Sequence, residues 1–298
     1  MEKRQYGQTD MQVSVLGFGG AEIGFQHADA SDVERLLSNA LESGLNVIDT
    51  AECYAGSEEL IGQTVAQRRR EYYLFTKCGH ASGMNGTDWD PKMLSEQIDR
   101  SLKRLRTDYV DVIHLHSCRE DILKQGDVID VLQRAKQEGK TRYIGYSGDG
   151  RAALWAVESG LFDSLETSLN IADQEAIELT IPKAMEQGMG VIAKRPIANA
   201  AWVTGAPPVS EYARPYWHRL QDLDYDFLQW DVEDSIAHAL RFTLSVPGIG
   251  TAIVGTAKSG RYRQNAVMAN KGALGQAEYP SIRARWQAVA KPDWVGLT

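Results

Sequence analysis

The feature that most constrains the fold is a regular alternation of short apolar runs with longer segments of helical periodicity. Several of the apolar runs lack the polar–apolar alternation of a half-exposed strand. This is typical of strands that are buried on both faces of a parallel sheet. We predict eight strands, at residues 13–18, 46–51, 72–76, 109–115, 142–147, 164–169, 190–193 and 251–255.

The segments between these runs predict helices. In residues 32–43 the apolar side chains recur at the spacing of one helix face. Similar patterns occupy residues 58–67, 94–105, 122–138, 152–159, 177–187 and 235–245, and several helices are followed by a glycine (Gly44, Gly139, Gly160, Gly188). Without a linker-like change in composition, this order predicts an α/β fold of the (β/α)8 TIM-barrel class, with residues 1–298 as a single domain. A doubly wound dinucleotide fold is disfavoured, because LGFGGAEIG at residues 16–24 does not match G-x-G-x-x-G.

Two segments lie outside the alternation. Residues 1–12 contain the turn-like sequence GQTD at 7–10, which predicts a hairpin before the first strand. Residues 197–232, in the C-terminal half, form a long loop that contains Trp202, Trp217 and Trp230. Connections of this length are often lids or binding loops, and a helical insertion that packs its tryptophans on the barrel is the alternative.

Composition and charge exclude several classes of protein. With 43% hydrophobic and 24% charged residues among 298, the chain has enough apolar side chain to fold as an ordered globular protein. The net charge of −8 argues against a general nucleic-acid binder. No apolar stretch approaches the roughly 20 residues that a membrane helix needs. Three cysteines and a polar N-terminus predict a reduced, cytoplasmic protein.

Chemically active side chains follow three consecutive strands. Asp49 ends the second predicted strand, Lys77 follows the third and His116 follows the fourth, while Tyr54 lies in the loop beyond Asp49. In a TIM barrel the C-terminal strand ends form the active site. Each residue alone has an ordinary structural explanation, as a helix cap, a solvent-exposed lysine or a buried imidazole. The four together at one end of a barrel favour a catalytic site.

These four residues are suited to carbonyl chemistry. A lysine buried near the barrel mouth needs a partner, and Asp49 on the adjacent strand is the expected one. The ammonium group should lower the pKa of Tyr54 from about 10. Tyr54 can then protonate a carbonyl oxygen that gains charge during hydride transfer, while His116 orients that oxygen. His114 and His116 form an H-x-H pattern, but we expect no metal and place His114 one layer deeper in the barrel.

At this point the sequence resembles the aldo-keto reductase superfamily over nearly its whole length. The matching stretches include NVIDTAECYAGSEELIG (46–62), LFTKCG (74–79), TDYVDVIHLHS (107–117) and GVIAKRP (190–196). The resemblance implies a (β/α)8 barrel that uses NADP(H) and a catalytic tetrad of Asp49, Tyr54, Lys77 and His116. It implies an oxidoreductase that reduces aldehydes or ketones, or oxidises the alcohol, so the expected partner is a small carbonyl or alcohol substrate.

The resemblance also implies a set of cofactor-binding residues. Asp49 belongs to it, Ser147 is expected at the nicotinamide carboxamide, and Thr256, Arg261, Gln264 and Asn265 are expected at the adenosine 2′-phosphate and adenine. The segment from Gly255 to Asn265 contains three cations, Lys258 among them, and no acid. It therefore suits a phosphate, and NADPH rather than NADH is the hypothesis.

Three positions depart from the family pattern. Gly148 stands where an asparagine is common, Glu166 where a glutamine is expected, and Lys194 where an aromatic ring often stacks on the nicotinamide. These departures motivate an alternative, an NADP(H)-binding regulatory or sensor protein with weakened catalysis. A Schiff-base aldolase that uses Lys77 or Lys194 is a third hypothesis.

Substrate determinants are expected in residues 80–91 and 197–232. Trp89 and Trp202 are candidates to line the substrate pocket, together with Tyr54 and His116. Cys53, Cys78 and Cys118 each lie within two residues of a tetrad member. Apolar packing is the usual role of such free cysteines, and a redox-sensitive site is the alternative.

Overall fold

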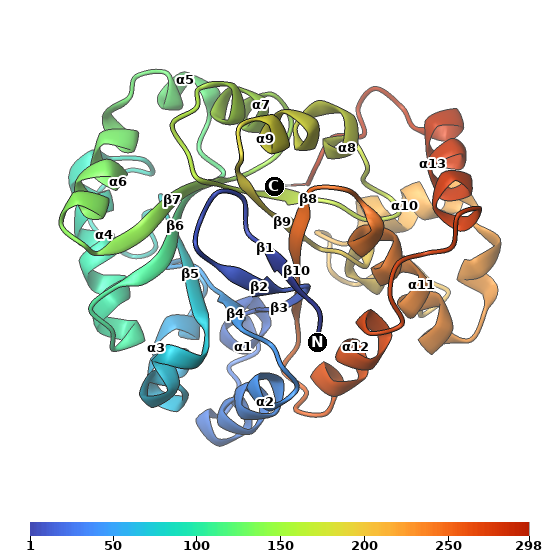
Figure 1. Ribbon diagram of the computed structural model, residues 1–298, viewed down its shortest axis with the longest axis horizontal. Helices are drawn as coiled ribbons and strands as arrows, with labels where there is room; N and C mark the ends of the chain where they lie inside the picture. The colour runs from blue at the N-terminus through green and yellow to red at the C-terminus, as the bar shows by residue number, and fades with distance from the viewer. Residues whose placement is uncertain (298) are drawn as a thin grey trace.

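A closed barrel of parallel strands forms the centre of the protein, whose computed structural model describes residues 1–297. The strands follow one another around the barrel in the order β10-β3-β4-β5-β6-β7-β8-β9 (Figure 1). Their bounds are β3 (Leu16–Gly19), β4 (Val47–Asp49), β5 (Tyr73–Cys78), β6 (Val110–His116), β7 (Thr141–Ser147), β8 (Ser164–Ser168), β9 (Gly190–Lys194) and β10 (Ile249–Gly255). The predicted (β/α)8 barrel is confirmed.

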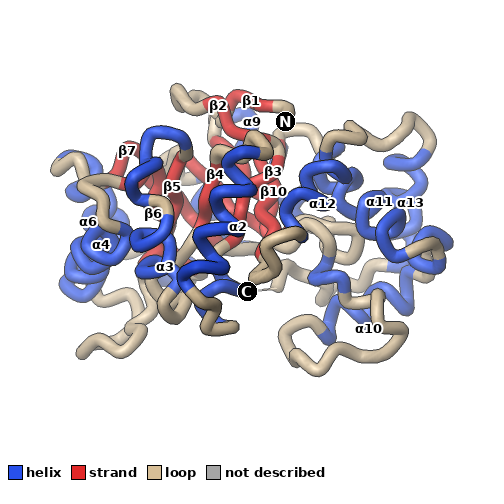
Figure 2. The backbone as a smooth tube through the Cα atoms, turned by 90° about the horizontal axis from the view of Figure 1, so that it is seen from below, coloured by secondary structure: helices blue, strands red, loops and turns tan. Residues whose placement is uncertain are grey.

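The N-terminal hairpin is present and closes one end of the barrel. β1 (Lys3–Gln5) pairs antiparallel with β2 (Gln12–Ser14). The prediction of a single strand over residues 13–18 was therefore wrong, because its first half belongs to this hairpin and its second half to β3. Figure 2 shows the hairpin at the end of the barrel opposite the C-terminus.

The lower part of the barrel interior is apolar. Tyr6, Met11 and Val13 of the hairpin segment pack there against side chains of the barrel strands (Val47, Phe75, Val112, Ile192, Ile253). All eight side chains in this cluster are buried. The hairpin thus fills the bottom of the barrel, and polar groups are left to the upper end.

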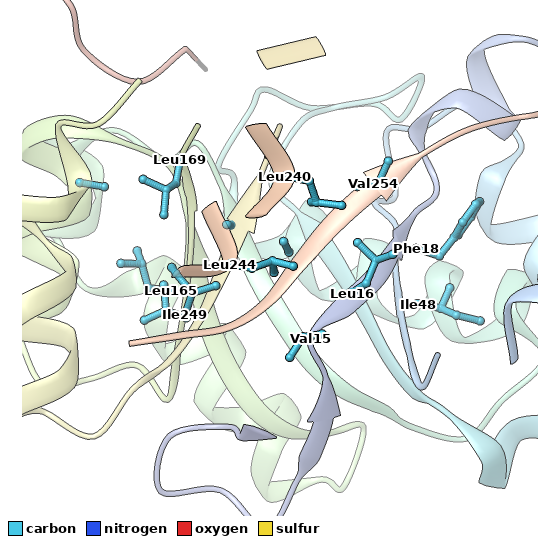
Figure 3. Close-up of a cluster of buried hydrophobic side chains, with 14 of the residues drawn as sticks. Val15, Leu16, Phe18, Ile48, Leu165, Leu169, Leu240, Leu244, Ile249 and Val254 are labelled. Atoms are coloured by element: carbon cyan, nitrogen blue, oxygen red, sulfur yellow. The ribbon is translucent and has the colours of Figure 1, made fainter. Parts of the chain in front are cut away.

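Helices surround the barrel and largely follow the predicted positions. Six of them are α2 (Ala30–Glu42), α3 (Ser57–Thr64), α4 (Pro91–Leu105), α6 (Asp127–Gln137), α7 (Gly150–Glu158) and α11 (Val232–Ser245). The apolar face of α2 is buried as expected, including Leu36 and Leu37. Each such leucine contributes roughly 1.5–3 kcal/mol on burial. Figure 3 shows part of the apolar layer, where Leu240 and Leu244 of α11 lie with Leu16 of β3 and Val254 of β10.

Two predicted helices are each divided in the structure. Residues 122–138 form α5 (Glu120–Leu123) and α6, separated at Gly126, whose φ of +88° interrupts the helix. Residues 177–187 form α8 (Ala176–Leu179) and α9 (Ile181–Glu186). Pro182 stands in the first turn of α9, where the missing N–H is tolerated.

The long segment 197–232 is a helical insertion. It contains η2 (Ala198–Ala200), α10 (Arg214–Leu223) and η3 (Asp226–Gln229). Trp202 is buried, Trp217 is half-buried against the main core and Trp230 is exposed. No bounds were predicted from the sequence for three further helices, α1 (Ala21–Phe25), α12 (Arg261–Ala269) and α13 (Glu278–Val289). None of the helices within residues 1–297 combines the length and the apolar character needed to cross a membrane.

Candidate active site

The barrel brings three of the predicted catalytic residues to the same strand ends. Asp49 ends β4, Lys77 is next to last in β5 and His116 ends β6. Lys77 Nζ donates a hydrogen bond to Asp49 Oδ2 at 2.5 Å and to the Thr50 carbonyl oxygen at 3.0 Å. Both side chains of the Lys77–Asp49 pair are almost completely shielded from solvent. The predicted ion pair is therefore present, and its burial is compensated by direct contact.

Tyr54 lies beside this pair, in the loop after β4. Its ring centroid is 5.5 Å from Lys77 Nζ, and its ring meets that of His116 edge-on at 5.8 Å. The predicted direction of its pKa shift was wrong. Lys77 does favour the phenolate, but burial outweighs it and raises the pKa of Tyr54 above its ordinary value. Tyr54 is therefore a protonated phenol in the protein without cofactor.

His116 is held from the side by Cys53. The Cys53 Sγ atom lies 3.4 Å from His116 Nδ1. Burial raises the pKa of the Cys53 thiol to about 11, so the sulfur carries a proton that it can donate. Burial and the nearby Lys77 charge hold the pKa of His116 well below its ordinary value. A neutral His116 that accepts at Nδ1 carries its own proton on Nε2.

Glu166 of β8 is a second carboxylate at Lys77. Its Oε2 atom lies 3.2 Å from Lys77 Nζ, and the side chain is as deeply buried as that of Asp49. Burial alone would lower the pKa of Lys77, but the two carboxylates outweigh it and raise this pKa. The lysine is thus a stable ammonium ion, which disfavours a Schiff-base role.

His114 lies deeper in the barrel, as predicted. It is fully buried, and its Nε2 atom is 2.8 Å from the Ser164 hydroxyl, which in turn is 2.5 Å from the Tyr6 hydroxyl. Burial lowers the pKa of His114 to about 4, so the ring is neutral. Asp49, His114 and Glu166 present ligand-type atoms within 4.8 Å of one another, but Lys77 forms ion pairs with both carboxylates and supplies the positive charge there.

Comparison with known proteins identifies the family. A sequence model of the aldo/keto reductase family matches residues 15–287. The chain belongs to the aldo/keto reductase family. It is 28% identical to L-galactose dehydrogenase of Arabidopsis thaliana, in an alignment that covers 99% of this chain and 97% of that protein. It is also 28% identical to the NADH-specific methylglyoxal reductase of Escherichia coli, over 66% of this chain and 68% of that protein.

The structural comparison agrees with the family assignment. The holo form of an aldo-keto reductase from Bacillus halodurans matches with a TM-score of 0.83 and 27% identity, and 99% of each chain is covered. The protein is thus an oxidoreductase of a family whose members generally bind a nicotinamide cofactor.

Two unpaired polar groups fit such a cofactor. The Ser147 hydroxyl oxygen and the Asn265 side-chain nitrogen are buried without a hydrogen-bond partner among residues 1–297. Ser147 ends β7 beside Glu166, and Asn265 lies in α12 just beyond β10. Both groups lie at the ends of the expected cofactor site, so they are free to bind the polar atoms of such a ligand.

The segment expected to bind a phosphate, residues 255–265, has acidic side chains near it in the fold. Lys258, Arg261 and Gln264 are exposed around the start of α12. Arg263 instead turns toward Asn39 and Glu42, at 3.2 and 4.0 Å. The run itself contains no acid, but the fold brings Glu42 of α2 near it and also Glu22, which packs over Gly255. Thr256 is buried, and its hydroxyl accepts a hydrogen bond from the Lys258 N–H.

The departure at residue 148 has a steric explanation. A β-carbon at Gly148 would lie only 2.5 Å from the Tyr146 hydroxyl oxygen. Tyr146 is itself fixed, because its hydroxyl donates to the Cys118 carbonyl oxygen at 2.8 Å. The asparagine common in the family has no room here.

Lys194 is held by a partner that the sequence analysis did not identify. Its Nζ atom lies 3.0 Å from Asp149 Oδ2. Asp149 also accepts hydrogen bonds from Thr167 Oγ1 and the Ser168 N–H. Burial would raise the pKa of Asp149, but Lys194 and these donors together lower it. Lys194 thus belongs to a buried ion pair at the end of β9.

The two tryptophan candidates differ in position. Trp89 packs over Gly79, and its ring meets that of His80 at 5.0 Å, which in turn lies 5.0 Å from the His116 ring. The His80 ring thus separates Trp89 from the tetrad residue His116. Trp202 is instead buried toward α11, where its indole N–H donates to Ser235 Oγ at 3.0 Å. That donor is therefore not available to a substrate.

The C-terminal segment also reaches the strand ends, which the sequence did not predict. Ser168 Oγ of β8 donates to the Leu297 carbonyl oxygen at 3.2 Å, and Arg219 of α10 donates to the Val295 carbonyl oxygen at 2.8 Å. Gly296 packs so closely on Asp149 that a β-carbon would lie 2.3 Å from the carboxyl carbon. Figure 1 shows the C-terminus beside β8.

Proposed function

We propose that this aldo/keto reductase reduces aldehydes or ketones with NADPH, and that Tyr54 donates the proton. The carrying observation is the arrangement of Tyr54 beside both the buried Lys77–Asp49 ion pair and the neutral His116. A protonated phenol at this position is a general acid in its active form. Oxidation of the alcohol or of a sugar is the same chemistry in reverse.

Tyr54, Lys77 and Asp49 would each have a separate role in carbonyl reduction. When bound, the nicotinamide supplies a hydride from C4 to the carbonyl carbon. Tyr54 gives its hydroxyl proton to the carbonyl oxygen, which yields the alcohol and a phenolate. Lys77, close to the Tyr54 ring, stabilises that phenolate until a proton from water restores the phenol. Asp49 holds Lys77 in place for this role.

His116 would orient the substrate. Its Nε2–H, fixed by acceptance at Nδ1, can donate to the carbonyl oxygen and stabilise the negative charge that develops there. Trp89, packed beside His80, supplies an apolar wall near this point. Trp202 is assigned to packing.

For the cofactor we propose that Ser147 and Asn265 bind the carboxamide and the adenine, and that Arg261 and Lys258 bind the 2′-phosphate of NADPH. An exposed arginine at a helix N-terminus suits a phosphate in charge and geometry. One relative is NADH-specific, so the proposed preference for NADPH over NADH is tested directly. Fluorescence titration should show tighter binding of NADPH, and equal affinity for NADH would contradict the assignment.

The experiment that tests the catalytic proposal is the Tyr54→Phe variant. NADPH absorbance loss is followed over a panel of aldehydes, ketones and sugars, including L-galactose for the reverse reaction with NADP⁺. The variant should retain cofactor binding and lose activity by about 10²–10⁴-fold. Unchanged turnover would refute Tyr54 as the acid. Tight NADPH binding by both proteins without turnover would favour the NADP(H)-binding sensor instead.

A further inference from the structure

A charge count around Lys77 shows an excess of buried carboxylate. Lys77, Asp49 and Glu166 have side chains that are at most 2% exposed, and the ammonium nitrogen is 2.5 Å from one carboxylate and 3.2 Å from the other. Two ionised carboxylates around one ammonium would leave a net negative charge in a site shielded from water. Such a charge is unfavourable, and a bound proton removes it.

The neighbouring groups do not compensate for this charge. The titratable groups that face the two carboxylates or Lys77 come from five elements or loops, and they are Lys77, Tyr54, His114, His116, Lys194 and Tyr6. Both imidazoles are neutral and both phenols are protonated because burial shifts their pKa values in those directions. Lys194 is paired with Asp149 and adds no net charge. Lys77 is therefore left as the only cation for two carboxylates among the groups named here.

We propose that Asp49 and Glu166 hold one shared proton between them, and that the site releases this proton to solvent when the oxidised nicotinamide cofactor binds. Two carboxylates forced together in a buried site commonly retain one proton. Burial and the neighbouring Glu166 carboxylate raise the pKa of Asp49 well above its ordinary value, which agrees with this assignment. The proton belongs to the pair rather than to either residue.

The release half of the proposal rests on the proposed function. Glu166 pairs in register with Ser147, whose orphaned hydroxyl marks the expected nicotinamide end of the cofactor site. The oxidised nicotinamide ring is cationic and the reduced ring is neutral. A cation near Glu166 favours the doubly ionised carboxylate pair. The proton is therefore released only when the oxidised cofactor binds, and not when the reduced cofactor binds. Glu166 thus acts through the charge of the site, which it adjusts to the oxidation state of the nicotinamide ring.

Infrared spectroscopy of the protein without cofactor tests the shared proton. The measurement is made above the range in which Glu58 and Asp173 titrate, since burial raises both of their pKa values to about 7. The wild-type protein should show the carbonyl band of a protonated carboxyl group. Glu166→Gln and Asp49→Asn should each abolish it, because the remaining carboxylate then ionises against Lys77. Glu58→Gln, which alters a buried carboxylate elsewhere, should retain it.

The shared proton is overturned if the wild-type band is missing, or if either single variant keeps it. Melting temperatures of the variants confirm that each is folded. Retention in one variant alone would show a proton that is fixed on one residue.

Calorimetry tests the release. NADP⁺ is titrated in two buffers of different ionisation enthalpy, with NADPH as the matched ligand because it carries the same phosphates. Wild-type protein should release about one proton on binding NADP⁺ and none on binding NADPH, and Glu166→Gln should release none with either. Equal release by wild type and variant would overturn the coupling. Failure of the wild type to bind NADP⁺ would overturn both the release and the proposed function, whereas the infrared band decides the shared proton independently.

Discussion

At the scale of single residues, the catalytic side chains depend on neighbours that set their protonation and orientation. Cys53 precedes Tyr54 in the chain, and its thiol faces the Nδ1 atom of His116 at 3.4 Å. Which imidazole nitrogen carries the proton is decided by the hydrogen bond that the other nitrogen makes. The role of His116 therefore rests on a neighbour that is not itself part of the tetrad.

This dependence predicts the effect of changing Cys53. Cys53→Ala removes the donor to Nδ1, and carbonyl reduction should fall about fivefold, the equivalent of one ordinary hydrogen bond. Cys53→Ser keeps a donor and should restore most of the activity. Nitrogen NMR of His116 should show the Nε2–H tautomer in the wild type and the serine variant, and a mixture in the alanine variant. An identical tautomer in all three proteins would contradict the interpretation.

At the scale of secondary structure, α4 supports the loop that carries His80. Asp90 begins this helix by accepting a hydrogen bond from the Met93 N–H at 2.8 Å, and Pro91 occupies the first turn. One turn later, Gln97 Oε1 accepts from the Gly79 N–H at 3.0 Å. The second turn of the helix thus anchors the backbone at Gly79, between Lys77 and His80.

Removing this helix cap should weaken the protein measurably. Asp90→Ala leaves the Met93 N–H without its acceptor and should lower the free energy of unfolding by about 1 kcal/mol. Asp90→Asn retains an acceptor oxygen and serves as the control. Urea unfolding followed by circular dichroism gives both values. Equal losses in the two variants would show that the Asp90 charge, rather than the cap, matters.

The elements also show what the sequence could predict. The ends of the strands could be predicted because buried parallel strands are apolar. Their C-terminal ends lie at one end of the barrel, so Asp49, Lys77 and His116 could be placed together. The direction of the Tyr54 pKa shift was not readable, since it depends on how much water the folded site excludes. The partner of Lys194 and the acids near the phosphate segment come from elements distant in sequence. No local pattern specifies such contacts.

At the scale of the whole molecule, buried titratable groups set opposing trends with pH. His114 has a pKa lowered by burial to about 4, so the unfolded chain binds more protons between that value and 6.5, and stability falls as the pH decreases through this range. Glu58 and Asp173 act in the other direction. Burial raises both pKa values to about 7, so the folded protein binds more protons and stability falls as the pH rises toward 7.

Glu58→Gln isolates one of these contributions. Glu58 is 1% exposed and accepts a hydrogen bond from Thr76 Oγ1 at 2.7 Å, a bond that the glutamine carbonyl can also accept. Between its ordinary pKa of 4.5 and about 7, the wild type must progressively keep a proton that the unfolded chain releases. Relative to the variant, the wild type should therefore lose about 2 to 3 kcal/mol of unfolding free energy over this range. Urea unfolding at a series of pH values measures the difference, and parallel curves for the two proteins would show that Glu58 ionises normally in the folded protein.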